Sequence, residues 1–263
     1  MTLSATTLLD TWEGGLSQTA IHRALLLLAL CPTVRTTTPL ANMCLGERDA
    51  HLLLLRQHLF GSRLDGSTTC PECGELLEAA LRIEDILLDI QPGYGQSFWA
   101  NTGIHDVTGT SYEVRYRLPT STDMLNVARA VVRTGERSVN KNLARSELLR
   151  HCVLEAYLLD ISGSRVAVLA ADLTESAATT VMAHMSQTDP QGDVQLSLSC
   201  PVCRHAWLAL FDIVSFLWAE VDAWAQHLLS EVHALAAGYG WSEADILTMS
   251  AWRRQWYLQA LSQ

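Results

Sequence analysis

The sequence predicts an α+β fold that is mainly helical. Both ends of the chain carry apolar residues at helical spacing, whereas parts of the middle alternate apolar and polar residues in the manner of half-buried strands. With 263 residues, 49% of them hydrophobic, the chain has enough apolar material for one large domain or two modest ones. We therefore expect it to fold without help.

The N-terminal region, residues 1–66, is predicted to be helical. A first helix is expected over residues 18–30, with Ser17 as its cap and Pro32 as its stop signal. A loop over residues 33–39 leads to a second helix over residues 46–60, for which Gly61 supplies the C-cap.

The middle of the chain, residues 83–191, is predicted to be an inserted segment of helices and strands. Alternation favours a strand over residues 112–118, and Thr120 with Asp123 is typical of a helix start, with that helix running to about residue 132. Further helices are expected over residues 143–158 and 175–185. Residues 91–109 are rich in Gly, Ser and Asn and look irregular, but the sequence does not resolve their structure. Residues 75–82 fit either a strand or a helix start.

The C-terminal region, residues 212–263, is predicted to be a long helix followed by a helical tail. Apolar residues recur with spacings of four and three over several turns, and Gly238 or Gly240 ends the pattern. Ser242 and Ser250 are expected to cap two shorter helices. The seam of the long helix comprises Val214, Trp218, Val221, Ala225, Leu228, Val232 and Leu235.

Four of the seven cysteines form two C-P-x-C pairs, Cys70 with Cys73 and Cys200 with Cys203. Two cysteines separated by two residues in a tight turn can direct both sulfurs at one ion, and two such turns supply the four thiolates that a tetrahedral zinc site requires. The second pair lies in a predicted hairpin formed by an alternating stretch before Cys200 and residues 206–211 after Cys203.

The four cysteines therefore predict a split zinc ribbon made of two β-hairpin knuckles, residues 67–82 and 192–211. The pairs lie much farther apart than the usual 15 to 20 residues, so two unrelated turns or a redox pair stay as alternatives. A site of three cysteines and His205, and iron in place of zinc, also stay open. Because four protein ligands leave no position for water, the ion is expected to be structural.

The two knuckles differ in the residue that follows the cysteine pair. Gly74 follows the first pair, where positive φ is often required, whereas Arg204 follows the second and is expected to cost about 1 kcal/mol of strain. The other cysteines, Cys31, Cys44 and Cys152, are expected to be small buried side chains.

The sequence predicts no catalytic site, and we expect no enzyme activity. His227, Glu231 and His233 lack the H-E-x-x-H spacing and are expected to lie on a solvated helix surface. His151 and Cys152 are adjacent in a predicted helix and therefore point in different directions.

Charge and motifs also argue against several binding functions. The chain has 18 Lys and Arg against 28 Asp and Glu, a net charge of -10, which repels nucleic acid. Lys141 is the single lysine, no P-loop is present, and neither Gly93 with Gly95 nor Ser162 with Gly163 completes a dinucleotide or hydrolase motif. The longest apolar run, residues 24–31, is too short to cross a bilayer, and the first residues carry no basic start, so no membrane association and no signal peptide are predicted.

Several motifs together resemble a known family. They are Leu45-Gly46-Glu47-Arg48-Asp49, Leu59-Phe60-Gly61, the two cysteine pairs, Phe211-Asp212-Ile213, Glu231-Val232-His233-Ala234-Leu235-Ala236, the stretch from Tyr239 to Leu247 that contains Gly-Trp-Ser, and Arg253-Arg254. The chain resembles the baseplate proteins of contractile-tailed phages and contractile injection systems, which include baseplate hub assembly chaperones. The resemblance covers residues 40 to 85 and 190 to 263, and its most distinctive part is the tail. Arg204 in place of glycine departs from the family pattern.

The resemblance implies a zinc-stabilised, non-catalytic protein of the bacterial host cytoplasm that either helps to assemble a baseplate or remains in it. We expect protein partners, contacted through the helix Asp212–Ala236 and the aromatic residues Trp252, Trp256 and Tyr257. The alternative for these apolar surfaces is packing on the N-terminal leucine helices. A zinc-ribbon nucleic-acid-binding or regulatory protein is the rival function, although it needs a basic face that this composition hardly allows.

Overall fold

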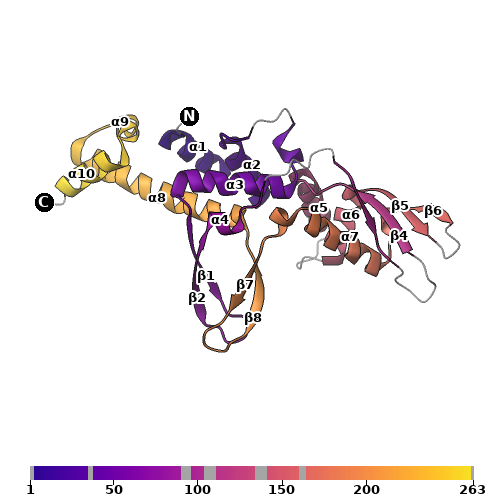
Figure 1. The fold of residues 1–263 in the computed structure, drawn as a ribbon. Coiled ribbons are helices and arrows are strands. Elements are labelled where there is room, and N and C mark those ends of the chain that lie inside the picture. The colour runs from indigo at the N-terminus through magenta and orange to yellow at the C-terminus, as the bar shows by residue number, and fades with distance from the viewer. Residues whose placement is uncertain are drawn as a thin grey trace. The chain divides into compact units, whose positions relative to one another are not determined.

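The computed structural model describes residues 3–34, 38–89, 96–103, 111–133, 141–159 and 164–261. It divides the chain into two compact units. Unit 1 joins the two ends of the chain, Met1–Pro32 and Ile213–Gln263, and unit 2 is Thr33–Asp212. Figure 1 shows the elements of both, which mix helices with small antiparallel sheets, as an α+β fold requires.

Unit 1 is helical and is built around the long C-terminal helix. It contains α1 (Ala5–Gly15), α2 (Ala20–Ala29), α8 (Ile213–Tyr239), α9 (Glu243–Thr248) and α10 (Ala251–Leu261). Every residue of the predicted α8 seam is buried, and α1, α2, α9 and α10 all contact α8. The seam therefore forms the core of unit 1, which is the alternative that the sequence left open.

Local signals explain two of the helix ends in unit 1. The hydroxyl of Ser242 accepts a hydrogen bond from the backbone N–H of Asp245, and Gly240 has a φ of 71° where α8 ends. The predicted start of the helix over residues 18–30 was wrong, because α2 begins at Ala20 after Thr19 and not after Ser17. Residues 16–18 instead form the turn that leaves α1, in which Arg23 donates hydrogen bonds to the carbonyl oxygens of Gly15 and Leu16.

In unit 2, α3 (Leu45–Phe60) is anchored at its first turn. The backbone N–H of Gly46 donates to Oδ2 of Asp189 at 2.9 Å, and a Cβ at position 46 would lie 1.7 Å from Oδ1 of the same carboxylate. Only glycine leaves room for this contact. Since α3 leads into one hairpin and η3 (Pro190–Asp193), directly after Asp189, leads into the other, the contact holds the two chain segments together.

The two hairpins that follow are β1 (Arg63–Thr69) with β2 (Leu76–Arg82), and β7 (Gln195–Ser199) with β8 (Ala206–Leu210). The segment that fitted either a strand or a helix start is thus strand β2, after which α4 (Ile83–Ile86) forms one helical turn. Figure 1 shows the hairpins side by side, with their tips brought together.

A four-stranded antiparallel sheet forms the rest of unit 2. Its strand order is β3 (Phe98–Asn101), β4 (Ser111–Tyr116), β5 (Val153–Leu159) and β6 (Arg165–Val168). One sheet face packs with α6 (Lys141–Cys152) and α7 (Glu175–Thr188) on a core that includes Tyr112, Val114, Tyr116 and Val181. The short helix η2 (Ala170–Asp172) contacts α6 and β5, whereas α5 (Ser121–Arg133) packs on α6 and also contacts the short helix η1 (Leu40–Asn42).

One prediction for this segment was wrong. The helix expected over residues 143–158 ends at Cys152, and the chain continues as β5 without a turn. Pairing of β5 with both β4 and β6 outweighs the local helical pattern there. In the stretch that the sequence left unresolved, residues 98–101 form β3, whereas residues 90–95 and 104–110 lie outside the described residues.

The predicted helix start at Thr120 is confirmed, and Asp123 is its main anchor. The Asp123 carboxylate accepts hydrogen bonds from the Thr120 backbone N–H at 2.9 Å and from both terminal nitrogens of Arg117 at 2.7 and 2.8 Å. Burial of Asp123 acts to raise its pKa, but the hydrogen bonds from Arg117 and Thr120 outweigh this effect, so the pKa lies below the ordinary value.

We expect Asp123→Asn to lower the free energy of unfolding by about 2 kcal/mol at neutral pH, because it removes a buried charged acceptor. A depressed folded-state pKa stabilises the protein above the unfolded-state pKa, near 3.9, and this contribution is lost as the pH falls through the folded-state value. Urea unfolding of both proteins at decreasing pH checks this. A difference between wild type and variant that does not shrink in acid would contradict it.

In the part of the chain that the structure describes, no helix combines the length and the apolar character needed to cross a membrane.

Candidate metal centre

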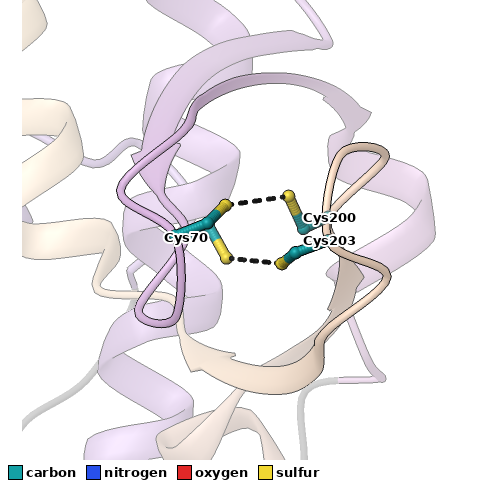
Figure 2. A group of neighbouring side chains, drawn as sticks. Cys70, Cys200 and Cys203 are labelled. Carbon is teal, nitrogen blue, oxygen red and sulfur yellow. Dashed lines mark hydrogen bonds between the residues drawn. The ribbon is translucent and has the colours of Figure 1, made fainter.

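The tips of the two hairpins are equivalent turns. In the first, the Cys70 N–H donates to the Glu75 carbonyl oxygen at 2.8 Å, and the Gly74 N–H donates to the Cys70 carbonyl oxygen at 3.0 Å. In the second, the Cys200 N–H donates to the His205 carbonyl oxygen and the Arg204 N–H donates to the Cys200 carbonyl oxygen, both at 2.9 Å. Each turn places two sulfurs on the side that faces the other turn, as Figure 2 shows.

The structure brings together all four cysteines that the sequence selects as ligands. The Sγ atoms of Cys70 and Cys203 lie 3.6 Å apart, as do those of Cys73 and Cys200, and all four sulfurs lie within 4.8 Å of one another. A tetrahedron of thiolates with metal–sulfur bonds of about 2.3 Å has edges of about 3.8 Å. The observed separations bracket this value, so the four residues fit a metal ion bound by four sulfurs. Two unrelated turns would not meet in this way.

Backbone N–H groups stabilise the thiolates unequally. The N–H groups of Cys203 and Val202 donate to the Cys200 sulfur, and the pKa of Cys200 falls to about 7 as a result. The Glu75 N–H also lowers the pKa of Cys73, but loss of solvent and the three neighbouring thiols outweigh it and raise that pKa to about 12. Four thiols this close cannot all ionise without a cation between them. A bound divalent ion would supply that charge and cross-link the two hairpins.

The residue after each cysteine pair has left-handed backbone geometry. The φ angle of Gly74 is 77° and that of Arg204 is 62°, the one described non-glycine residue with positive φ. The second turn thus keeps the geometry of the first, and the strain expected at Arg204 is present in its backbone.

We expect Gly74→Ala to weaken metal retention about fivefold, because an alanine at this φ costs about 1 kcal/mol and no atom lies within 4 Å of its Cβ to cause any other effect. Competition with a coloured zinc chelator measures the change. Gly14→Ala in α1, a glycine whose added Cβ also meets nothing within 4 Å, is the control and should leave retention unchanged. Equal retention in both variants would contradict the prediction.

The remaining cysteines and His205 do not join the cluster. The His205 ring stacks on Trp207 with centroids 5.9 Å apart. Among the described residues, the group of candidate metal ligands consists of Cys70, Cys73, Cys200 and Cys203. Cys31, Cys44 and Cys152 are buried, as expected, and burial raises the pKa of Cys152 to about 12.

One prediction about the long helix was wrong. Glu231 is 7% exposed and does not lie on a solvated surface. Its carboxylate accepts a hydrogen bond from Arg254 Nε of α10 at 2.7 Å and also contacts Gln255 and His227. The sequence pattern of α8 alone could not reveal the pair of Glu231 and Arg254, because Arg254 belongs to a different helix. The residues of the incomplete dinucleotide and hydrolase motifs, 93, 95, 162 and 163, lie outside the described residues.

The fold and the site define a mixed helix-and-sheet protein whose two distant hairpins meet at a four-thiol cluster that could hold a metal ion. A family model described as "T4 bacteriophage base plate protein" matches residues 27–218, which is more than half of the chain. The chain therefore belongs to this phage baseplate family, as the sequence resemblance implied. No curated protein and no solved structure matches it.

The matched region differs from the one on which the resemblance was drawn. It includes both hairpins and the inserted segment between them, most of which the resemblance did not cover, and it ends at residue 218. The C-terminal end of the chain, which is the most distinctive part of the resemblance, lies beyond the matched region. Family membership therefore rests mainly on unit 2, which carries the cysteines.

Proposed function

We propose that this protein is a non-catalytic, zinc-stabilised protein that acts in the assembly or structure of a contractile-tail baseplate through protein–protein contacts. The match to the phage baseplate family carries the proposal, because it covers both knuckles of the cysteine cluster. The partners are then other baseplate or tail proteins, and the protein acts in the host cytoplasm or in the particle.

The four thiols support zinc as the ion. Soft thiolate ligands in a tetrahedral arrangement are the usual environment of structural zinc, and they also suit iron. With all four positions filled by protein, the ion has no site at which to activate water, so its contribution is to hold the hairpins. A metal ion whose four positions are all taken by cysteines also supports the proposal that the protein has no catalytic activity.

Of the two segments expected to contact partner proteins, α8 and α10, the last helix, α10, is the better candidate. Because the seam of α8 is buried within unit 1, the aromatic residues of α10 are the better candidates. Trp252 is 76% exposed and Trp256 54%, whereas Tyr257 packs on Trp241 and Tyr239. Exposed tryptophans are frequent energetic centres of protein interfaces.

The proposal predicts that the protein co-purifies with a baseplate subunit when the two are expressed together. Replacing Trp252 and Trp256 by serine should reduce capture at least tenfold, since each residue would contribute about 2 kcal/mol at an interface. Trp99→Ser, which removes an exposed tryptophan of unit 2, is the matched control and should not affect capture. Quantitative mass spectrometry of the captured subunits measures both.

Two outcomes would contradict the proposal. One is that no baseplate or tail protein is captured by the wild-type protein. The other is retention on DNA that weakens steeply with salt, which would favour the zinc-ribbon nucleic-acid binder. The presence of the protein in purified tails would distinguish a permanent component from an assembly chaperone.

A further inference from the structure

The hairpin β1–β2 has an outer edge that pairs with no other strand among the described residues. At its two ends, the Cys70 N–H donates to the Glu75 carbonyl oxygen and the Ile83 N–H donates to the Ser62 carbonyl oxygen. Together with the register, these two bonds show which opposite residues of β1 and β2 are bonded to each other. Because such pairs alternate along an antiparallel ladder, the backbone groups of Leu76, Glu78 and Ala80 point away from β1.

The hairpin β7–β8 also has outer edges that pair with no other strand among the described residues. Cys200 N–H bonds to His205 at one end, and Phe211 N–H bonds to Val194 at the other. The backbone groups of Ser197 and Ser199 in β7, and of Ala206 and Leu208 in β8, therefore point away from their own hairpin. Each hairpin has only two strands with partly exposed faces, an arrangement that is marginally stable by itself.

A cavity of about 470 Å³ lies between the two hairpins, next to the cysteine cluster. Its lining is uneven. Residues 75–79 and Thr68 line it on the side of the first hairpin, and Leu198, Ser199 and Pro201 line it on the side of the second. Strand β8 contributes no residue, so the cavity runs along β2 and β7.

We propose that this cavity receives an extended segment of a partner protein, which adds to the outer edge of β2 as a further strand. Unpaired backbone donors and acceptors are what strand addition recognises, and apolar side chains of the segment would meet the leucines of the lining, Leu76, Leu77 and Leu198. Glu75 and Glu78 are the only charged residues in the lining, so the segment carries Lys or Arg beside them. This inference rests on the proposed function, since it specifies one contact of the baseplate partner.

A model peptide tests the inference independently of any baseplate subunit. The probe is a fluorescein-labelled peptide of about seven residues, the length of a strand, that alternates valine and lysine. Two control peptides replace lysine by glutamate or carry N-methylated amides, which cannot form a ladder. Binding to the purified full-length protein is followed by fluorescence anisotropy.

Matched variants locate the binding edge. Glu78→Pro removes an outward N–H at the cavity, whereas Leu208→Pro removes an equivalent outward N–H of β8, which does not line the cavity. Glu78→Lys keeps the backbone and reverses the charge, so it tests the site even if a proline variant does not fold.

We expect Glu78→Pro and Glu78→Lys each to weaken peptide binding about tenfold or more, and Leu208→Pro to change it less than about twofold. The glutamate and N-methylated peptides should bind at least about tenfold more weakly than the valine–lysine peptide. The inference is overturned if the valine–lysine peptide does not bind, if its N-methylated form binds equally well, or if Glu78→Lys has no effect. Failure of the peptide would leave co-purification with a baseplate subunit, and thus the proposed function, intact.

Discussion

Cys70→Ser and Cys203→Ser should each leave the protein insoluble or sensitive to protease. Each change removes one thiolate from a cluster whose four sulfurs lie within 4.8 Å of one another and come from two separate hairpins. Structural zinc sites contribute about 10–16 kcal/mol of apparent binding energy, which is comparable to the entire stability of a typical domain. Neither hairpin has a fully buried face that would replace this contribution.

Solubility, limited proteolysis and metal content of each variant measure the effect. Cys31→Ala is the control, because Cys31 is buried but lies outside the cluster, so its loss should reduce stability without reducing metal content. Unchanged stability in both serine variants would refute a structural metal.

Arg254→Leu is expected to lower the free energy of unfolding of unit 1 by about 3–5 kcal/mol. The Arg254 side chain is 8% exposed and lies 2.7 Å from the Glu231 carboxylate, which is equally buried. Removing the arginine leaves the carboxylate buried without its main cation. Arg254 also donates to the Met249 carbonyl oxygen at 2.8 Å, so the same change loosens the start of α10.

Urea unfolding followed by circular dichroism, together with proteolysis mapped near the C-terminus, checks this expectation. Arg253→Leu is the matched control, since Arg253 is the exposed neighbour on the same helix. The double variant Glu231→Leu with Arg254→Leu should recover much of the stability, because no unpaired charge remains. Equal stability of the Arg254 and Arg253 variants would show that the pair does not hold α10 on α8.

Local signals in the sequence were sufficient where an element depends on its own residues. Alternation predicted β4, Gly61 marked the end of α3, and Asp123 three residues after Thr120 marked the start of α5. The repeated C-P-x-C spacing selected the four cysteines that the structure brings together, although they are far apart in the chain.

Other features depend on contacts between distant segments and could not be predicted. No glycine or proline separates α6 from β5, and only pairing with two neighbouring strands makes residues 153–159 extended. The contact between Gly46 and Asp189 and the ion pair between Glu231 and Arg254 each join residues that no local pattern connects. The orientation of the hairpin edges likewise required the register of the strands.

X-ray absorption spectroscopy at the zinc edge of the purified wild-type protein is the most direct test of the structural metal. We predict one zinc per chain with four sulfur ligands at about 2.3 Å and no nitrogen or oxygen ligand. Protein that folds without any bound metal, or a metal shell that contains fewer than four sulfurs, would contradict a structural four-cysteine site.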